Sequence, residues 1–197
     1  MLEELLVSRR SVRHYEKGSL EFKQVEKIVW AGMGIRHGHK RTAPSAGGCY
    51  PLWMYLIVGE VTGLDPGIYS CPSNVSPSIH PSGSPSISPM GRIKEGDFRQ
   101  GLCDAALGQK AVAEAQIDIV IAADYGGICQ RYGRRGVRYA YIEAGHIGQN
   151  IALQAIELGL GTVMIGAFRD GAVKALLEIK EEPIYIIPVG KMKGEQR

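Results

Sequence analysis

Three short stretches of the sequence carry residue types that could bind an anionic or flat ligand. The first is RRSVRHY, which places Arg9, Arg10, Ser11 and Arg13 within five residues. If this stretch is extended, Arg9, Ser11 and Arg13 point to one face, while Arg10 and Val12 point to the other. Guanidinium groups suit phosphate and planar acceptors, and a hydroxyl supplies one more donor. The stretch therefore predicts a phosphate or planar-ring site, with a solvated basic strand as the alternative.

The second stretch is PSAGGCYP, which contains Pro44, Ser45, Ala46, Gly47 and Gly48. Small residues let a backbone approach a flat ligand closely, and a glycine at positive φ can present its N–H group. Taken alone, this composition favours an ordinary surface loop, with a ligand-contacting loop as the alternative.

The third stretch is IGAF, in which Ile165, Gly166 and Ala167 stand at the end of a predicted buried strand. Ligands commonly bind beyond strand ends in layered folds. The glycines just before it do not form a dinucleotide fingerprint, because that motif needs a strand before them and a helix after them. Gly159 and Gly161 are instead expected to be a helix C-cap and a turn glycine.

The elements that must position these stretches are predicted from hydrophobic periodicity and from breaker residues. Helices are expected over 2–8, from an N-cap at Ser19 to about residue 32, and over 101–116, 138–158 and 170–177. Strands are expected over 54–61, 118–124, 162–168 and 184–190. This order predicts one layered domain of the α/β or α+β class over residues 1–197, without internal repeats.

Two segments depart from the ordinary pattern. The helix over 138–158 is apolar nearly all round, through residues such as Ile142 and Ile151, and such a helix belongs in a large core or across a subunit interface. Residues 70–92 hold eight serines and five prolines, so no strand ladder or helix is expected there. That segment is interpreted as an irregular surface excursion or as the remnant of a lost hairpin.

Composition excludes several classes of protein. The 197 residues are 45% hydrophobic and 22% charged, and the net charge of +3 gives no footprint for nucleic acid. The arginines at 131, 134, 135 and 138 are interpreted as solvent-exposed residues at the start of a helix rather than as an RNA-binding patch. The cysteines at 49, 71, 103 and 129 lack the spacing of zinc ligands, so no metal site is expected. They are expected to be free thiols. No signal peptide or bilayer span is recognised, which predicts a cytoplasmic protein without a membrane partner.

The three stretches, together and in this order, resemble the nitroreductase family of FMN-dependent oxidoreductases. RRSVRHY is similar to the family's R-x-S-x-R/K motif, PSAGGCYP to its Pro-Ser loop, and EAGHIGQNIALQAIELGLGTVMIGAF to its long central helix and flavin-facing strand. The resemblance covers most of the chain outside 70–92. It is nearest to the branch of the SagB-type dehydrogenases, which oxidise azolines during peptide modification. It implies a mostly antiparallel sheet flanked by helices, and a homodimer with flavin at the interface.

The resemblance also implies roles for individual residues. Arg9 would pair with the FMN phosphate, Ser11 would donate to the phosphate or ribityl chain, and Arg13 would lie against the N1/O2 side of the ring. Pro44, Ser45 and Ala46 would come from the partner subunit, and the backbone of Gly166 and Ala167 would lie near flavin N5. The full implied cofactor-binding set is Arg9, Arg10, Ser11, Arg13, Pro44, Ser45, Ala46, Gly47, Gly48, Ile165, Gly166, Ala167, Lys191 and Lys193.

The sequence departs from the family pattern at three places. Gly48 replaces an asparagine that bonds to flavin, and Gly166 replaces an acidic residue common before the N5-facing glycine. A basic pair beyond Gly190 is missing, so Lys191, Lys193 and Arg197 at the C-terminal end, and also Arg41, are the candidates to complete the phosphate site.

The implied activity is electron transfer from NAD(P)H through FMN to a small acceptor, such as a quinone or a nitro compound, by a ping-pong mechanism. Two alternatives remain. One is a SagB-like azoline dehydrogenase or flavin-binding partner subunit, and the other is a nucleic-acid-binding module built on the arginine clusters.

Overall fold

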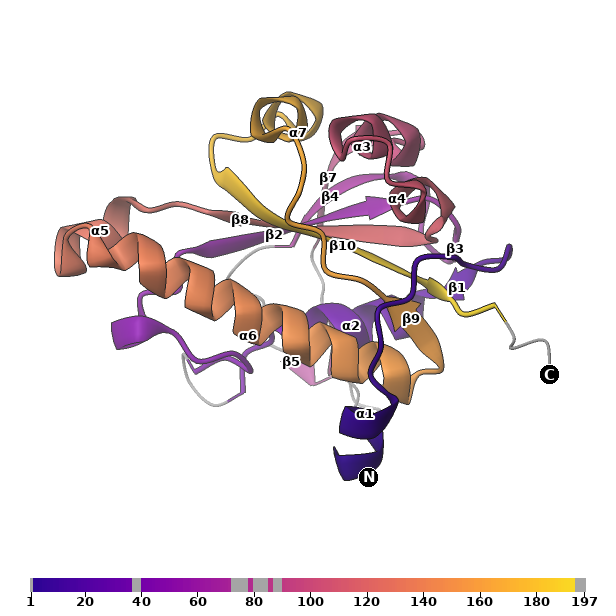
Figure 1. The fold of residues 1–197 in the computed structure, drawn as a ribbon, viewed down its shortest axis with the longest axis horizontal. Coiled ribbons are helices and arrows are strands. Elements are labelled where there is room, and N and C mark those ends of the chain that lie inside the picture. The colour runs from indigo at the N-terminus through magenta and orange to yellow at the C-terminus, as the bar shows by residue number, and fades with distance from the viewer. Residues whose placement is uncertain (1, 37–39, 72–77, 80–84, 87–89, 194–197) are drawn as a thin grey trace.

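A six-stranded sheet forms the centre of the computed structural model, which describes residues 2–36, 40–71, 78–79, 85–86 and 90–193 (Figure 1). Its strand order is β7-β4-β2-β8-β10-β9, and every neighbouring pair is antiparallel. The strands are β2 (Leu52–Val58), β4 (Gly67–Cys71), β7 (Gly91–Glu95), β8 (Ile117–Ala123), β9 (Leu160–Thr162) and β10 (Glu182–Lys191). The expected α+β class with a central antiparallel sheet is confirmed.

Helices cover both faces of this sheet. The helices are α1 (Leu2–Ser8), α2 (Phe22–Met33), α3 (Arg99–Ala105), α4 (Lys110–Glu114), α5 (Gly126–Tyr132), α6 (Arg135–Glu157) and α7 (Asp170–Leu177). One face packs against α2 and α6, and the other against α3, α4 and α7 (Figure 1). No helix within the described ranges combines the length and the apolar character that crossing a membrane requires.

The central strand β8 is buried on both faces, as its continuous apolar run predicts. Ile119 and Ile121 pack into the cluster with α2 and α6, whereas Val120 and Ala122 pack into the cluster with α3 and α7. Successive side chains alternate between the two faces of a strand, so one run of seven residues supplies both cores.

The long helix α6 has a buried stripe and an exposed stripe. Ile147 and Ile151 belong to the core of the single chain, and Ile151 is 0% exposed. Of the two alternatives expected for this helix, a core or a subunit interface, Ile151 takes the core. The exposed apolar side chains of α6 are Tyr141 and Ile142, at 54% and 50% exposure.

The expected helix over 101–116 is two helices, α3 and α4. The chain turns between them at Leu107 and Gly108, with φ of 61° and 75°. A left-handed conformation ends a helix, and glycine adopts it at little cost. The leucine gave no local signal of the break, because leucine favours helices.

Two other boundaries differ from the prediction. The N-cap of α2 is Glu21, whose capping box pairs it with Gln24, and Ser19 instead bonds through its hydroxyl to Thr62 at 2.9 Å. The strand expected over 162–168 stops at Thr162. Beyond it, a single bridge joins Ile165 to β10.

Part of the serine- and proline-rich segment forms strands, contrary to expectation. β4 and β7 pair as far as Ser70 and Gly91, and the two-residue strands β5 (Ser78–Ile79) and β6 (Pro85–Ser86) pair with each other. A ladder needs backbone groups alone, and proline is tolerated at a sheet edge. The rest of 72–89 lies outside the described residues. A further small pair joins β1 (Leu20–Glu21) to β3 (Val61–Thr62) in parallel.

Candidate active site

The N-terminal stretch is held against the edge strand β9. Ser11 forms a parallel bridge with Thr162, and the Val12 N–H donates to the Thr162 carbonyl at 2.9 Å. Gly161 makes this approach possible, because a Cβ at that position would meet the Val12 Cβ at 2.7 Å. Gly161 is thus a strand glycine rather than the expected turn glycine, whereas Gly159, with φ of 72°, does end α6.

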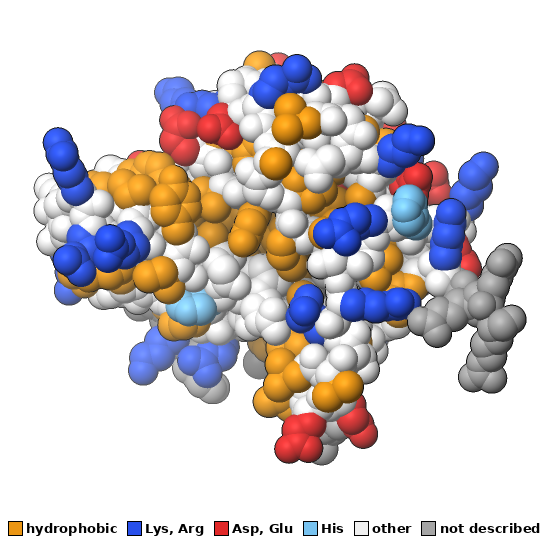
Figure 2. Space-filling view, viewed as in Figure 1, with side chains coloured by type: hydrophobic (Ala, Val, Ile, Leu, Met, Phe, Trp, Pro, Cys, Tyr) orange, Lys and Arg blue, Asp and Glu red, His pale blue; other side chains and the backbone are white. Residues whose placement is uncertain are grey.

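Side chains in this stretch alternate as expected. Val12 is half-buried and shares a cavity with Arg10, whereas Arg9, Ser11 and Arg13 do not line it; all three arginines and Ser11 are exposed. Within the described part of the chain, neither Arg9 nor Arg13 has an acidic partner within ion-pair distance. Lys and Arg side chains gather over this segment in Figure 2. The result is an exposed basic edge that fits a phosphate group.

Arg10 occupies the other face of the stretch. It lines a cavity of about 410 Å³ together with Val12, Ile156, Gly161 and Met192. The structure therefore separates Arg10 from the face that Arg9 and Arg13 share.

The segment after β9 presents backbone donors. Ile165 is fixed to Ile186 by two hydrogen bonds of 2.9 and 3.0 Å, and the Ala167 carbonyl accepts a bond from the Gln109 side chain at 2.8 Å. Gly166 and Ala167 are exposed, and the N–H of neither has a partner among the described residues. Hydrogen bonds at Ile165 and at the Ala167 carbonyl fix this segment, so its unpaired N–H groups suit a ligand that accepts hydrogen bonds.

The Pro-Ser loop lies elsewhere in the chain. Pro44, Gly47 and Gly48 are exposed, and both glycines have positive φ, at 58° and 65°. The Gly48 N–H is used inside the loop, where it donates to the Ser45 carbonyl at 3.1 Å. A Cβ at Gly48 would meet nothing within 4 Å, so the position opens into free space.

Within one chain, α6 separates this loop from the other two stretches (Figure 1). The loop is tied to the α5 end, where Arg131 Nη1 donates to the Gly47 carbonyl at 2.9 Å. The N-terminal stretch meets the other end, beside Ile156. The 23-residue helix is about 35 Å long at 1.5 Å per residue, so one chain presents two separate half-sites.

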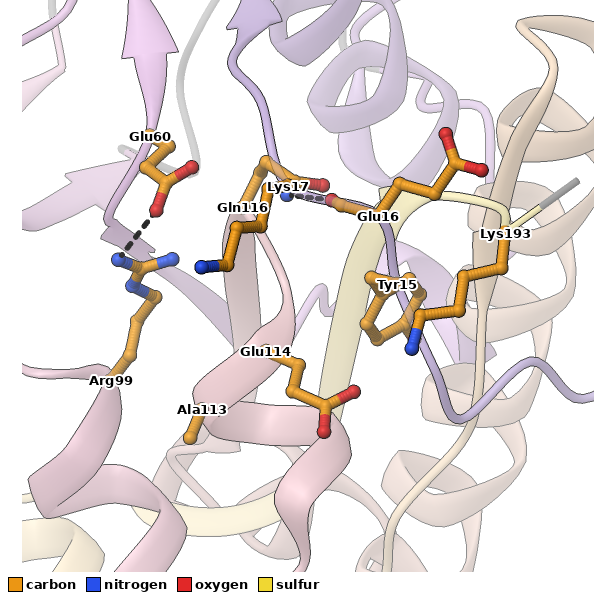
Figure 3. Close-up of a pocket in the computed structure, with 9 residues that line it drawn as sticks. All are labelled: Tyr15, Glu16, Lys17, Glu60, Arg99, Ala113, Glu114, Gln116 and Lys193. Atoms are coloured by element: carbon orange, nitrogen blue, oxygen red, sulfur yellow. Dashed lines mark hydrogen bonds and ion pairs between the residues drawn. The ribbon is translucent and has the colours of Figure 1, made fainter.

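The two C-terminal lysines have different surroundings. Lys191 packs its side chain along Gly18, and Lys193 lines an open cavity of about 1060 Å³ near Tyr15 and Glu114 (Figure 3). A phosphate-binding role for either lysine stays a prediction. Arg197 lies outside the described residues.

The polar groups at the centre of this large cavity are already used. Gln116 donates to the Glu16 carbonyl and accepts from the Lys191 N–H, while Arg99 bonds to Asp97 and to the Ala115 carbonyl. Burial raises the pKa of Tyr15, whose hydroxyl donates to the Val12 carbonyl at 2.9 Å. The side chains of Gln116, Arg99 and Tyr15 therefore join structural elements around this cavity.

Two buried residues beneath the Pro-Ser loop were not predicted as a pair. Arg41, a candidate for the phosphate site, is 8% exposed in the single chain, and burial lowers its pKa. Glu143 of α6 is 2% exposed, and burial raises its pKa to about 7. One sequence signal was available for Glu143: it stands three residues after Ala140 and four before Ile147, on the apolar stripe of the helix.

Comparison with known proteins adds to this geometry. The profile of the Nitroreductase family matches residues 6–191, which include all three stretches. The chain belongs to the nitroreductase family. This nitroreductase-family protein is an oxidoreductase, and it is 40% identical over 192 residues to a Methanocaldococcus jannaschii protein assigned as a nitroreductase. That match covers 96% of this chain and 90% of the other.

Solved structures share the fold. A nitroreductase assigned in Anabaena variabilis is 27% identical with a TM-score of 0.79, and the match covers 98% of this chain but 38% of that one. A nitroreductase assigned in Ralstonia eutropha is 23% identical with a TM-score of 0.77, and the match covers 99% of this chain and 84% of that one. A chain of the Escherichia coli microcin synthetase McbBCD complex is 18% identical with a TM-score of 0.78, and covers 95% and 70%. The last two show the fold alone.

Proposed function

We propose that the protein is a homodimeric FMN-dependent oxidoreductase that transfers electrons from NAD(P)H to a small acceptor, such as a quinone or a nitro compound. The observation that carries the proposal is the pair of half-sites on opposite sides of α6. One half has the free N–H groups of Gly166 and Ala167 with exposed arginines, and the other is the Pro-Ser loop. A second copy related by a two-fold axis would bring one half of each kind together.

The exposed stripe of α6 supports such a dimer. Tyr141 and Ile142 stand one turn before Gly145 and His146, and all four are exposed. Residues four apart lie on one helix face, so the stripe is a continuous surface for a second helix. Two antiparallel copies of α6 would place the loop end of one beside the β9 end of the other. Exposed apolar side chains are also present on α1, among them Leu6, near the C-terminal end of α6.

The residues present fit FMN at both of its ends. The exposed Arg9 and Ser11 would bind the phosphate, since guanidinium and hydroxyl donors match its oxygens. Arg13 would lie against the N1/O2 side of the ring, where a fixed cation stabilises the negative charge of the reduced state. The N–H groups of Gly166 and Ala167 would donate to the ring near N5.

Catalysis in this proposal needs few side chains. FMN, when bound, supplies a two-electron carrier that is reduced by NAD(P)H and reoxidised by the acceptor in ping-pong fashion. The chain's own contribution is binding and orientation: the arginines hold one end, and the small residues of the loop leave room for donor and acceptor in turn.

The experiment that tests the proposal uses the purified full chain, reconstituted with FMN and freed of excess. We expect a yellow homodimer that holds on the order of one flavin per chain. Its absorbance near 450 nm should be bleached by NADH or NADPH in the absence of oxygen and restored by quinone or nitroaromatic acceptors. A folded chain that stays monomeric and takes up no FMN would contradict the proposal. A yellow dimer that neither nicotinamide reduces would favour the SagB-like dehydrogenase or partner subunit.

A further inference from the structure

The side chain of Gln109 is bonded to the segment that carries the free N–H groups of Gly166 and Ala167. Its amide nitrogen donates to the Ala167 carbonyl at 2.8 Å and to the Ala106 carbonyl at 2.9 Å. An amide carries two N–H groups, so it can make both bonds at once. Gln109 therefore ties the segment after β9 to the turn between α3 and α4, which lies 58 positions earlier in the sequence.

The turn between α3 and α4 has a strained backbone that presents Gln109 at this place. Leu107 and Gly108 both have positive φ, at 61° and 75°. The Gly108 N–H donates to the Cys103 carbonyl at 2.9 Å, and the Gln109 N–H donates to the Ala106 carbonyl at 3.3 Å. A left-handed conformation is uncommon for leucine, and strained residues of this kind cluster at active sites and ligand sites. The turn thus directs the glutamine side chain to the segment after β9 instead of continuing the helix.

Hydrogen bonds fix two of the three peptide planes around Gly166. The Ile165 carbonyl accepts the Ile186 N–H at 3.0 Å, so the Gly166 N–H, which shares that trans peptide plane, points away from β10. The Ala167 carbonyl is fixed in turn by Gln109. The plane between them contains the Ala167 N–H, and it has no hydrogen bond of its own among the described residues. Its orientation depends on the two fixed planes beside it, because a glycine backbone would otherwise rotate freely.

The outer edge of β9 is where these N–H groups and the basic stretch come together. Val12 lies along this edge, since its N–H donates to the Thr162 carbonyl at 2.9 Å. The Gly166 N–H leaves the chain on the same side, away from β10. The arginine stretch and the backbone donors thus follow one edge of the sheet, as a single elongated ligand requires.

We propose that Gln109 is a positioning residue for flavin reduction: through the Ala167 carbonyl it holds the Ala167 N–H in the direction that the flavin N5 atom requires. This inference rests on the proposed function. A donor that is fixed before the ligand arrives needs no reorganisation during the reaction, whereas a mobile peptide must be ordered at each turnover. Gln109 lies outside the three stretches from which the site was predicted, and it acts through the backbone.

Arg169 gives the segment a second link to α3. Its N–H donates to the Ala105 carbonyl at 2.9 Å, and its Nη2 donates to the Asp104 carbonyl at 2.5 Å. These bonds secure the chain two residues beyond Ala167. Loss of the Gln109 bond alone should therefore loosen one peptide plane without detaching the segment.

The first test is anaerobic stopped-flow reduction of the FMN-loaded, full-length protein by saturating NADPH or NADH. Gln109→Met keeps the length and the neutral charge of the side chain but has no N–H donor. It should slow flavin reduction about tenfold, the effect of losing one hydrogen bond. The KM for the nicotinamide and the dissociation constant of FMN should change by less than about twofold.

The matched control is Gln100→Met. Gln100 is an exposed glutamine of α3 that donates to Asp104 of the same helix at 2.9 Å. It has no link to the segment after β9, so this variant should be reduced at the wild-type rate.

Nuclear magnetic resonance reports the hydrogen bond at N5 directly. With ¹⁵N-labelled FMN, the N5 resonance of Gln109→Met should move towards its position in an aprotic solvent, while that of Gln100→Met should stay at the wild-type position. A second measurement does not depend on the cofactor. In flavin-free protein, the Ala167 amide should have a lower heteronuclear NOE in Gln109→Met than in the wild type.

Three results would overturn the inference. An unchanged reduction rate or an unchanged N5 resonance in Gln109→Met overturns it alone. An equal loss of FMN affinity and of reduction rate also overturns it alone, because Gln109 would then only stabilise the fold. A wild type that binds no FMN overturns the proposed function, and the inference with it.

Discussion

Replacing Glu143 by glutamine should change how the stability of the flavin-free protein depends on pH. The pKa of Glu143 rises from 4.5 to about 7 because the carboxyl is buried. A carboxyl with a raised pKa binds its proton more tightly in the folded state. Its contribution to stability is complete below pH 4.5 and is lost as the pH rises through 7. Glutamine does not titrate, so the variant should not show this loss.

The magnitude follows from the shift. At about 1.4 kcal/mol for each unit of pKa, the wild type should lose roughly 2 to 3 kcal/mol relative to Glu143→Gln between pH 5 and pH 8. Asp118 is fully buried and its pKa is raised by burial, so it also makes stability fall with pH. Both proteins contain Asp118, and its effect cancels in their difference.

The assay is urea unfolding of both proteins at pH 5, 6, 7 and 8, at one ionic strength and one protein concentration. The quantity compared is the unfolding free energy of Glu143→Gln minus that of the wild type. A difference that stays constant within about 0.5 kcal/mol across this range would refute the reasoning, because that is the scatter expected of independent changes.

Three further predictions concern the half-sites. Arg13→Ala should weaken FMN retention and lower the flavin midpoint potential by a few tens of millivolts, measured by dye-coupled titration, whereas Arg138→Ala should leave both unchanged. Ile142→Glu should give a folded monomer without FMN in gel filtration, because Ile142 is half exposed, and a flavin-loaded monomer would contradict a shared site. Gly161→Ala should cost about 1–3 kcal/mol of stability and loosen the N-terminal stretch, because the new Cβ would overlap Val12.

The sequence predicted those elements whose residues signal them locally. All seven residues of β8 are buried, and six of them are apolar, which is typical of a strand covered on both faces. The order of the three stretches predicted the family, because each has its own residue types. The sequence could not decide which residues of α6 are buried in the core, because an apolar helix is compatible with a core and with a subunit interface. The structure shows that Ile151 is buried in the core.

Features that depend on distant parts of the chain could not be predicted in this way. The break at Leu107 has no signal in the leucine itself. The burial of Arg41 depends on α6, about a hundred residues later in the sequence, and the strand position of Gly161 depends on Val12. In each case a tertiary contact overrides local preference, and only the folded chain shows it.

The pairing of Ser11 with Thr162, and of Tyr15 with Met192, has a consequence for the order of folding. Each bridge joins residues that stand more than 150 positions apart in the sequence. Contacts so distant along the polypeptide form late, since a large loop must close before they bring any gain. The N-terminal stretch is therefore expected to reach its final place only after β9 and β10 have joined the sheet.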